Sequence, residues 1–342
     1  MNVRYAKDEQ KIFDAFILKN KGSFLQCSGW GELQHRSGRK MFKLLVQDQE
    51  EILLSALVLK YPEPFKKSYL YIPYGPVFNS NITEQKAKEA FALLLEKLKE
   101  RAEKEDAMFL KVELDDLKID LGLEGLGFIK SEKDAQARET LIMDVTQDED
   151  VILKNMKQKT RYNIKVAQKH GVEVMEPENK KQAFDNLYDL MKATEKRNGF
   201  SLHPKNYYQN MSDMFLGKEG VISQKIYVAK KGETVLASAL VSFHGKRATY
   251  LFGGSSDEYK NVMAPHLLHW HIIKDAKNMG CTEYDWWGIV TEKTRDDKKS
   301  VWSGFSRFKL GFGGNVVEYK GAYDLIFDKV WYFMYKIARK VL

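Results

Sequence analysis

Apolar and polar positions along the chain predict the same β-hairpin twice. Residues 40–58 contain two apolar strand-like runs that flank a charged turn, and residues 225–243 repeat this design. The second strand of each hairpin even shares the tetrapeptide SALV, at 55–58 and at 238–241. We expect an internal duplication, because the order of elements after each hairpin also matches, although identity between the halves is low.

Each hairpin is followed by a β-like segment, a helical pattern and one more strand. These segments are 68–77, 83–105 and 108–114 in the first half, and 247–256, 264–279 and 283–289 in the second. The order predicts an α/β (α+β) protein and resembles the GNAT acyltransferase fold in tandem, each domain a mixed, mainly antiparallel sheet flanked by helices. We place the domains at 1–147 and 148–342, with part of the C-terminal segment packing on the first. Two unrelated α/β segments are the alternative.

Charge and cysteine usage narrow the classes of partner and site. The 342 residues include 55 Lys and Arg against 47 Asp and Glu, and the net charge of +8 favours an anionic partner. Cys27 and Cys281 form no metal-binding pattern, so we expect core thiols, a reducing compartment and no metal. Without a secretion signal or an apolar run of membrane-spanning length, the expected location is the cytoplasm.

A basic segment points to nucleic acid. Residues 154–169 contain six basic residues and no acidic one, and their pattern predicts one continuous helix. On that helix, Lys154, Lys157, Arg161 and Lys165 would form a single stripe. A stripe of one sign favours contact with a phosphate backbone, whereas a solvated basic helix is the alternative.

Several catalytic signatures are absent from the sequence. It contains no GxxxxGK[ST], GxSxG or HExxH motif. Acyl-CoA-dependent GNAT enzymes carry a [QR]xxGx[GA] loop, but the corresponding segments 80–90 and 256–267 lack its glycines. We therefore expect an acyl donor other than acyl-CoA, and no cofactor.

Four segments resemble the Fem (FemABX) peptidyltransferases, namely 156–172, 200–208, 250–256 and 307–314. The resemblance extends over nearly the whole chain. It implies transfer of an amino acid from aminoacyl-tRNA to the stem-peptide amine of a peptidoglycan precursor, UDP-MurNAc-pentapeptide or lipid II, in interpeptide bridge synthesis. An aminoacyl ester is already activated, so such an enzyme needs positioning and an oxyanion donor rather than ATP, a metal or a covalent nucleophile.

The resemblance also implies roles for individual residues. Lys309 corresponds to the lysine that stabilises the transition state, and Phe308 to its aromatic neighbour. The segment 71–79 corresponds to the wall of the precursor pocket, with Tyr74 as the contact. Family members commonly carry an acidic residue where this chain has Asn79, which can orient the amine but cannot accept its proton. The glycines after Lys309 are expected to let the chain turn after a strand.

Further precursor contacts are implied in both halves. His203, Tyr207 and Tyr250 fall near positions that hold the diphosphate and sugar of the precursor. Arg197 would compensate for His203, since the family often has an arginine at that position. Arg36 is the candidate for a precursor contact near the N-terminus.

Two regional features complete the expectations. No sustained heptads occur in the second half, so the chain resembles the short, FemX-type branch without a coiled-coil arm. The C-terminal segment 324–342 is aromatic and basic, which predicts a helix packed on the body of a monomer. A peripheral contact with the inner face of the membrane is the alternative. An acyl-CoA-dependent N-acyltransferase and a non-catalytic RNA-binding module are the rival functions.

Overall fold

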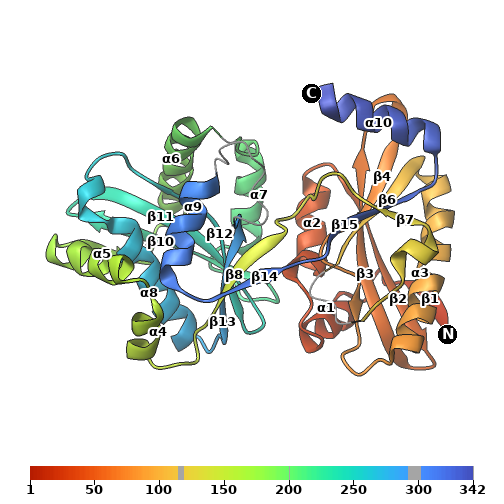
Figure 1. The fold of residues 1–342 in the computed structure, drawn as a ribbon, viewed down its shortest axis with the longest axis horizontal. Helices are drawn as coiled ribbons and strands as arrows, with labels where there is room; N and C mark the ends of the chain where they lie inside the picture. Colours follow the sequence, from red (N-terminus) through yellow and green to blue (C-terminus); the bar gives the residue numbers. More distant parts are fainter. Residues whose placement is uncertain (115–118, 200, 292–301, 342) are drawn as a thin grey trace. The chain divides into compact units, whose positions relative to one another are not determined.

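The computed structural model describes residues 1–114, 119–199, 201–291 and 302–341. They form two compact units (Figure 1). Unit 1 comprises Met1–Arg138 together with the C-terminal residues from Tyr319 on, and unit 2 comprises Glu139–Glu318. Within the described ranges, no helix is both long and apolar enough to cross a membrane.

Unit 1 is built on one sheet with the strand order β1-β2-β3-β4-β6-β15-β7, and β5 pairs with β3. Among these pairs, β4 and β6 run parallel and the others antiparallel. Its strands are β1 (Asn2–Tyr5), β2 (Lys40–Asp48), β3 (Glu51–Pro62), β4 (Ser68–Ile72), β5 (Val77–Phe78), β6 (Ala107–Leu114), β7 (Phe128–Lys130) and β15 (Gly321–Ile326). Its helices are α1 (Gln10–Lys19), η1 (Phe24–Gln26), α2 (Ser28–Arg36), η2 (Pro64–Lys66), α3 (Glu84–Lys104), η3 (Leu123–Leu126) and α10 (Lys329–Val341).

Unit 2 repeats this plan with the strand order β14-β8-β13-β12-β11-β10-β9, in which β12 and β13 run parallel. Its strands are β8 (Glu139–Asp144), β9 (Glu173–Met175), β10 (Ser223–Lys231), β11 (Thr234–His244), β12 (Arg247–Ser255), β13 (Glu283–Ile289) and β14 (Asn315–Glu318). Its helices are α4 (Glu149–Asn155), α5 (Gln158–Lys169), α6 (Lys180–Asn198), α7 (Lys205–Phe215), η4 (Lys260–Val262), α8 (Ala264–Asn278), α9 (Trp302–Lys309) and η5 (Leu310–Phe312).

The predicted duplication is confirmed. The hairpins β2–β3 and β10–β11 each lead into a strand, a helix and a further strand that pairs parallel with the first. Each unit buries its own apolar core, which in unit 1 is formed largely by the periodic residues of α3 and its sheet. Helix α3 starts where the Thr83 hydroxyl accepts a hydrogen bond from the Lys86 amide at 3.3 Å.

The two halves of the chain exchange one strand. Strand β8 follows β7 along the chain but pairs with β13 and β14, whereas β15 follows β14 but inserts between β6 and β7. The unit boundaries therefore differ from the expected division at 147/148, because residues 139–147 and the C-terminal segment each hydrogen-bond to the other half's sheet. A short strand-like pattern shows that a segment can pair in a sheet, but it does not show which strand it pairs with.

Two local predictions were wrong. Residues 154–169 do not form one helix, because Met156 and Lys157 adopt extended backbone angles between α4 and α5. Met156 is buried at this break, so packing of its side chain replaces a helical turn. Lys309 ends a helix rather than a strand, and the turn that follows uses positive φ angles at Gly313 and Gly314.

Candidate active site

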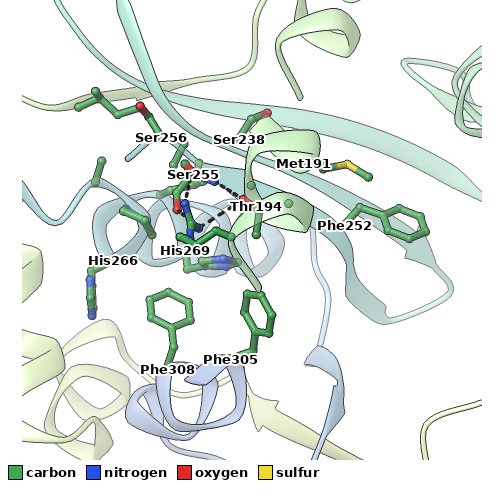
Figure 2. Close-up of a pocket in the computed structure, with 18 of the residues that line it drawn as sticks. Met191, Thr194, Ser238, Phe252, Ser255, Ser256, His266, His269, Phe305 and Phe308 are labelled. Atoms are coloured by element: carbon green, nitrogen blue, oxygen red, sulfur yellow. Dashed lines mark hydrogen bonds between the residues drawn. The ribbon is translucent and has the colours of Figure 1, made fainter. Parts of the chain in front are cut away.

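A cavity of about 510 Å³ lies in unit 2, walled by α6, β11, β12, α8 and α9. Figure 2 shows Phe305 and Phe308 rising from α9, with His266 and His269 on α8. Four residues predicted from the sequence line this cavity, namely Arg197, Tyr250, Phe308 and Lys309. The fold thus brings together residues that lie up to 112 positions apart, counted from Arg197 to Lys309.

The separation of β12 from β13 positions the lysine. The two strands pair only from Arg247–Glu283 to Thr249–Asp285. Beyond that point β13 is irregular, with a register shift against β8 between Asp285 and Gly288. The carbonyl oxygen of Gly288 accepts a hydrogen bond from Lys309 Nζ at 2.8 Å, on this irregular part of the strand.

Lys309 is held as an ammonium whose charge is only partly compensated. Burial lowers its pKa to about 8, although the Asp285 carboxylate opposes this shift. The Nζ also lies 5.6 Å from the centre of the Tyr250 ring, within range of a cation–π contact. An ammonium has three N–H donors, so Lys309 can donate to a substrate oxygen as well as to Gly288.

Asp285 is a buried carboxylate that the sequence analysis did not identify. It accepts hydrogen bonds from the Thr140 hydroxyl at 2.5 Å and from the Trp287 amide at 2.8 Å. Burial raises its pKa, while Arg247, with Nη1 at 3.9 Å from Oδ2, acts in the opposite direction. Asp285 therefore sets the electrostatic potential near Lys309 from the sheet itself.

Two histidines on α8 were also missed. The ring of Phe308 lies 5.0 Å from that of His266 and 5.6 Å from that of His269. Burial lowers the pKa of His266 to about 4 and that of His269 well below its usual value, so both rings are neutral at pH 7. Their spacing of three residues places them on one helical face, a signal that the sequence contained.

His266 connects the cavity with α5. Its Nε2 lies 3.0 Å from Nδ2 of Asn163, which is on the buried side of α5. The same helix meets the segment after Lys309, because the Lys157 amide donates to the Gly311 carbonyl at 2.9 Å. Gly311 also leaves no room for a side chain, since a Cβ there would lie 2.5 Å from Thr160 Oγ1.

The predicted basic stripe is divided by the break between α4 and α5. Lys154 is on α4, Lys157 precedes α5, and Lys165 is on α5. All three are exposed. Arg161 instead donates from Nη1 to the carbonyl oxygens of Lys154, at 3.2 Å, and Met156. Its guanidinium therefore closes the turn between the two helices.

The exposed side of α5 is nevertheless basic. It presents Lys159, Lys165 and Lys169 together with the exposed ring of Tyr162. The opposite side buries Thr160, Asn163, Ile164 and Ala167. Helix α5 thus has one face against the unit 2 core and one cationic face in solvent.

Arg197 is held at the cavity wall. Its Nη1 donates to Asp257 Oδ1 at 2.7 Å and to the Ser255 carbonyl at 3.3 Å. Lys260 Nζ approaches the same Asp257 oxygen at 2.7 Å. Two cations therefore share one carboxylate beside the cavity.

His203 and Tyr207 lie outside the residues that line this cavity, although Leu202 is among them. Their ring centres are 4.5 Å apart, and the His203 amide donates to the Tyr208 hydroxyl at 3.2 Å. They form an aromatic pair in which His203 precedes α7 and Tyr207 lies in its first turn.

The three candidates in unit 1 lie on different elements and have internal partners. The buried Tyr74 hydroxyl donates to the Ala137 carbonyl at 2.6 Å. Asn79 Nδ2 donates to the Ile52 carbonyl at 3.2 Å, and its Oδ1 accepts from the Asn81 amide at 3.0 Å. Exposed Arg36 places Nε 3.2 Å from a carboxylate oxygen of Glu32.

No group of three or more acidic, histidine or cysteine side chains in the described ranges is arranged to hold a metal ion. Both cysteines are buried thiols. Burial raises the pKa of each thiol. For Cys281, Lys246 lowers the pKa and Asp275 raises it, but burial has the larger effect.

Comparison with known proteins agrees with the resemblance to the Fem peptidyltransferases. The FemAB family model matches residues 9–118, 114–230 and 218–340. A lipid II:glycine glycyltransferase of Staphylococcus aureus (strain MRSA252) is 24% identical over 397 residues, covering 93% of this chain and 92% of the relative. A protein of the same name from Staphylococcus haemolyticus (strain JCSC1435) is equally similar.

Solved structures agree on the fold. The crystal structure of FemX is 22% identical and superposes with a TM-score of 0.83, covering 98% of this chain and 99% of that one. A tandem GNAT protein from the clavulanic acid biosynthesis pathway is 11% identical, with a TM-score of 0.56 over 94% of this chain and 98% of that one. The tandem GNAT-like architecture expected from the repeated elements is therefore confirmed.

Proposed function

Because this chain belongs to the FemAB family, we propose that it is an aminoacyltransferase that moves an amino acid from aminoacyl-tRNA to the stem-peptide amine of a peptidoglycan precursor. The observation that carries the proposal is the partly buried ammonium of Lys309 at the wall of a cavity, beside the separating strands β12 and β13. The Staphylococcus relatives are named for glycyl transfer and lipid II, and we extend that acceptor class to this chain.

In the proposed reaction, the amine nitrogen attacks the ester carbonyl carbon and a C–N bond forms. The carbonyl oxygen becomes an oxyanion, to which Lys309 Nζ donates a hydrogen bond. The ester C–O bond then breaks, and the proton lost by the amine goes to the leaving ribose oxygen. No ATP or covalent enzyme intermediate is needed, because the aminoacyl ester supplies the activation.

Phe308 and Lys309 line the same cavity, and we propose that Phe308 limits the access of water to the lysine. Its ring packs against His266, His269 and Trp286, so the lysine has an apolar wall on one side. Charge interactions are stronger where water is excluded. Since the two imidazoles are neutral, they add little repulsion to the ammonium at neutral pH.

For the donor RNA, we propose the cationic face of α5. Lys157 and Lys165 belong to the predicted stripe and are exposed, and Lys159 and Lys169 extend the same basic surface. The alignment with the Staphylococcus aureus relative is longer than this chain, so that relative has segments for which this chain has no equivalent. Contacts with RNA on the body of unit 2 suit such a shorter chain.

The assignments for the acceptor remain proposals. Arg36, Tyr74 and Asn79 would contact the precursor in unit 1, and His203 and Tyr207 in unit 2. The ring pair of His203 and Tyr207 suits stacking on a sugar or base, since His203 is exposed and Tyr207, at the start of α7, is partly exposed. Arg197 and Tyr250 line the cavity and would contact the substrate there.

The function is tested with purified protein, labelled aminoacyl-tRNAs, and either UDP-MurNAc-pentapeptide or lipid II. We expect a labelled product that survives ribonuclease treatment. Acetyl-CoA is offered in a parallel reaction and by calorimetry. Tight acetyl-CoA binding with no product from any aminoacyl-tRNA would favour an acyl-CoA-dependent N-acyltransferase. RNA binding without transfer to any acceptor would favour a non-catalytic RNA-binding module.

A further inference from the structure

Helix α10 is apolar on the side that faces solvent. Val330, Phe333, Met334 and Ile337 are 68%, 64%, 47% and 48% exposed, and their spacing places them on one face of the helix. None of the residues that the structure describes covers this face enough to bury them. Exposure of these apolar side chains to water costs solvation free energy unless they contact another apolar phase.

The inward side of α10 already accounts for how the helix is attached. The rings of Tyr332 and Tyr335 each lie 5.1 Å from the ring of Phe109 on β6. The Tyr332 hydroxyl also donates to Asp324 on β15 at 2.8 Å. Figure 1 shows α10 as the blue helix beside β4 and β6. Because this side anchors the helix, the outward apolar residues are not needed for its packing.

A second element adds to the same surface. Phe65 in η2 is 79% exposed, and its ring centre lies 5.8 Å from that of Trp331 on α10. Phe65 and Lys66 both have φ of 60°, a conformation that L-residues adopt at a cost. The exposed phenyl group thus extends the apolar face of α10 across a neighbouring segment that is distant in sequence.

Two exposed lysines lie at the end of this apolar face where α10 begins. Helix α10 contains no acidic residue in its sequence, and Lys329 at its start and Lys66 beside Phe65 are both exposed. Lys67 Nζ lies 5.3 Å from the centre of the Trp331 ring but also pairs with Asp328 Oδ2 at 3.7 Å, so its charge is partly compensated. In the described part of the chain, neither Lys66 nor Lys329 has an ion-pair partner.

We propose that this surface, made of Phe65, Val330, Phe333, Met334 and Ile337 with Lys66 and Lys329 at one end, docks on an anionic phospholipid bilayer. Apolar side chains enter the boundary between headgroups and acyl chains, while lysines attract anionic headgroups. A second copy of the chain fits less well, because a self-complementary contact would bring together two surfaces that each carry unpaired lysines. Helix α10 would lie along the membrane without crossing it.

Docking would have a consequence that rests on the proposed function. A bilayer-bound enzyme would meet a lipid-linked acceptor at high local concentration, whereas a soluble acceptor would gain nothing. The docking itself does not depend on that reaction.

Vesicle flotation tests the docking directly on the full-length protein. We expect binding to vesicles of phosphatidylcholine with phosphatidylglycerol, and weaker binding to phosphatidylcholine alone. The double variant Phe333→Ser/Ile337→Ser should lose roughly ten-fold in vesicle affinity, because two buried apolar side chains no longer enter the bilayer. The double variant Lys66→Glu/Lys329→Glu should lose a comparable factor, roughly ten-fold, on anionic vesicles only.

The matched control is Ile12→Ser/Val316→Ser, which removes two exposed apolar side chains elsewhere on the chain. This control should bind vesicles like the unmodified protein, and thermal melting should show that all variants remain folded. Failure of the unmodified protein to float, or equal flotation of the Phe333→Ser/Ile337→Ser variant, would overturn the proposal. So would a dimer, detected by light scattering, that this variant abolishes, since a second copy would then be the occupant.

A transfer assay separates this proposal from the proposed function. The Phe333→Ser/Ile337→Ser variant should keep its kcat/KM on UDP-MurNAc-pentapeptide and lose several-fold on lipid II embedded in anionic vesicles. If no acceptor is modified by any variant, the proposed function fails while flotation still decides the docking. Equal loss on both acceptors would contradict a role of this surface in reaching lipid-linked substrate.

Discussion

Lys309 Nζ donates a hydrogen bond to the carbonyl oxygen of Gly288 over 2.8 Å. This contact joins the end of α9 to the irregular part of β13, where the strand no longer pairs with β12. The lysine therefore has a fixed position despite its flexible side chain. A charge held in place before the reaction needs little reorganisation when an oxyanion forms.

Replacing Lys309 with methionine should reduce the rate constant of transfer by about 10²- to 10³-fold, the usual loss for an oxyanion donor. Methionine keeps much of the volume, so the cavity wall should stay intact. The measurement is single-turnover transfer with saturating aminoacyl-tRNA, alongside thermal melting. A Lys309→Met enzyme that retains near-normal transfer would refute the oxyanion role.

The rate of transfer should fall as pH rises through about 8, because Lys309 loses the proton that it donates. Its contribution to folding stability should change in the opposite direction. The folded pKa of about 8 lies below the usual value of 10.5, so between these values the unfolded chain binds the extra proton. Stability from this group therefore rises with pH across that window.

The pH dependence is measured as kcat from about two pH units below the Lys309 pKa of about 8 to about one and a half units above it. The rates are corrected for spontaneous hydrolysis of the ester. Urea unfolding at the same pH values gives the stability. In Lys309→Arg, whose guanidinium stays charged, residual activity should show no decline near pH 8. A decline that persists in this variant would assign the titration to another group.

Substituting Asp285 with asparagine should move the alkaline decline of the rate to lower pH. The carboxylate raises the pKa of Lys309 against the effect of burial, and a neutral amide of similar shape removes that support. The pH–rate profile of Asp285→Asn is compared with that of Thr140→Val, which removes a hydrogen bond to Asp285 but keeps the carboxylate. Similar profiles in Asp285→Asn and the unmodified enzyme would show that the two charges are not coupled.

The exposed lysines of α5 should contribute to RNA affinity. The variant Lys159→Glu/Lys165→Glu should raise the dissociation constant for tRNA and lower its dependence on salt, because fewer counterions are released. Lys99→Glu on the exposed side of α3 is the control, a single charge reversal in unit 1. Unchanged tRNA affinity in the α5 variant, or an equal loss in Lys99→Glu, would place the RNA contact elsewhere.

Arg161 should behave differently from those lysines. Its guanidinium binds carbonyl oxygens at the turn between α4 and α5, so Arg161→Ala should cost ~1–3 kcal/mol of unfolding free energy. Because the side chain is occupied within the fold, the effect on tRNA affinity should be smaller than that of Lys159→Glu/Lys165→Glu. Chemical denaturation and filter binding measure the two quantities. A stable Arg161→Ala protein with greatly weakened tRNA binding would return Arg161 to the RNA-binding surface.

The sequence by itself determined the duplicated architecture, because hydrophobic periodicity and the repeated SALV segments are local properties of the chain. It also identified Lys309, Phe308, Tyr250 and Arg197, which the structure gathers around one cavity. The roles of those four were implied by the resemblance to the Fem family rather than by periodicity or spacing.

Only the tertiary structure decided which sheet receives β8 and β15, since strand patterns do not encode the partner. It also decided the break at Met156, where burial of one side chain overrides a continuous helical pattern. The tertiary structure likewise made Asp285 and the histidines of α8 part of the site. Their pKa values and contacts depend on long-range burial, which no stretch of sequence displays on its own.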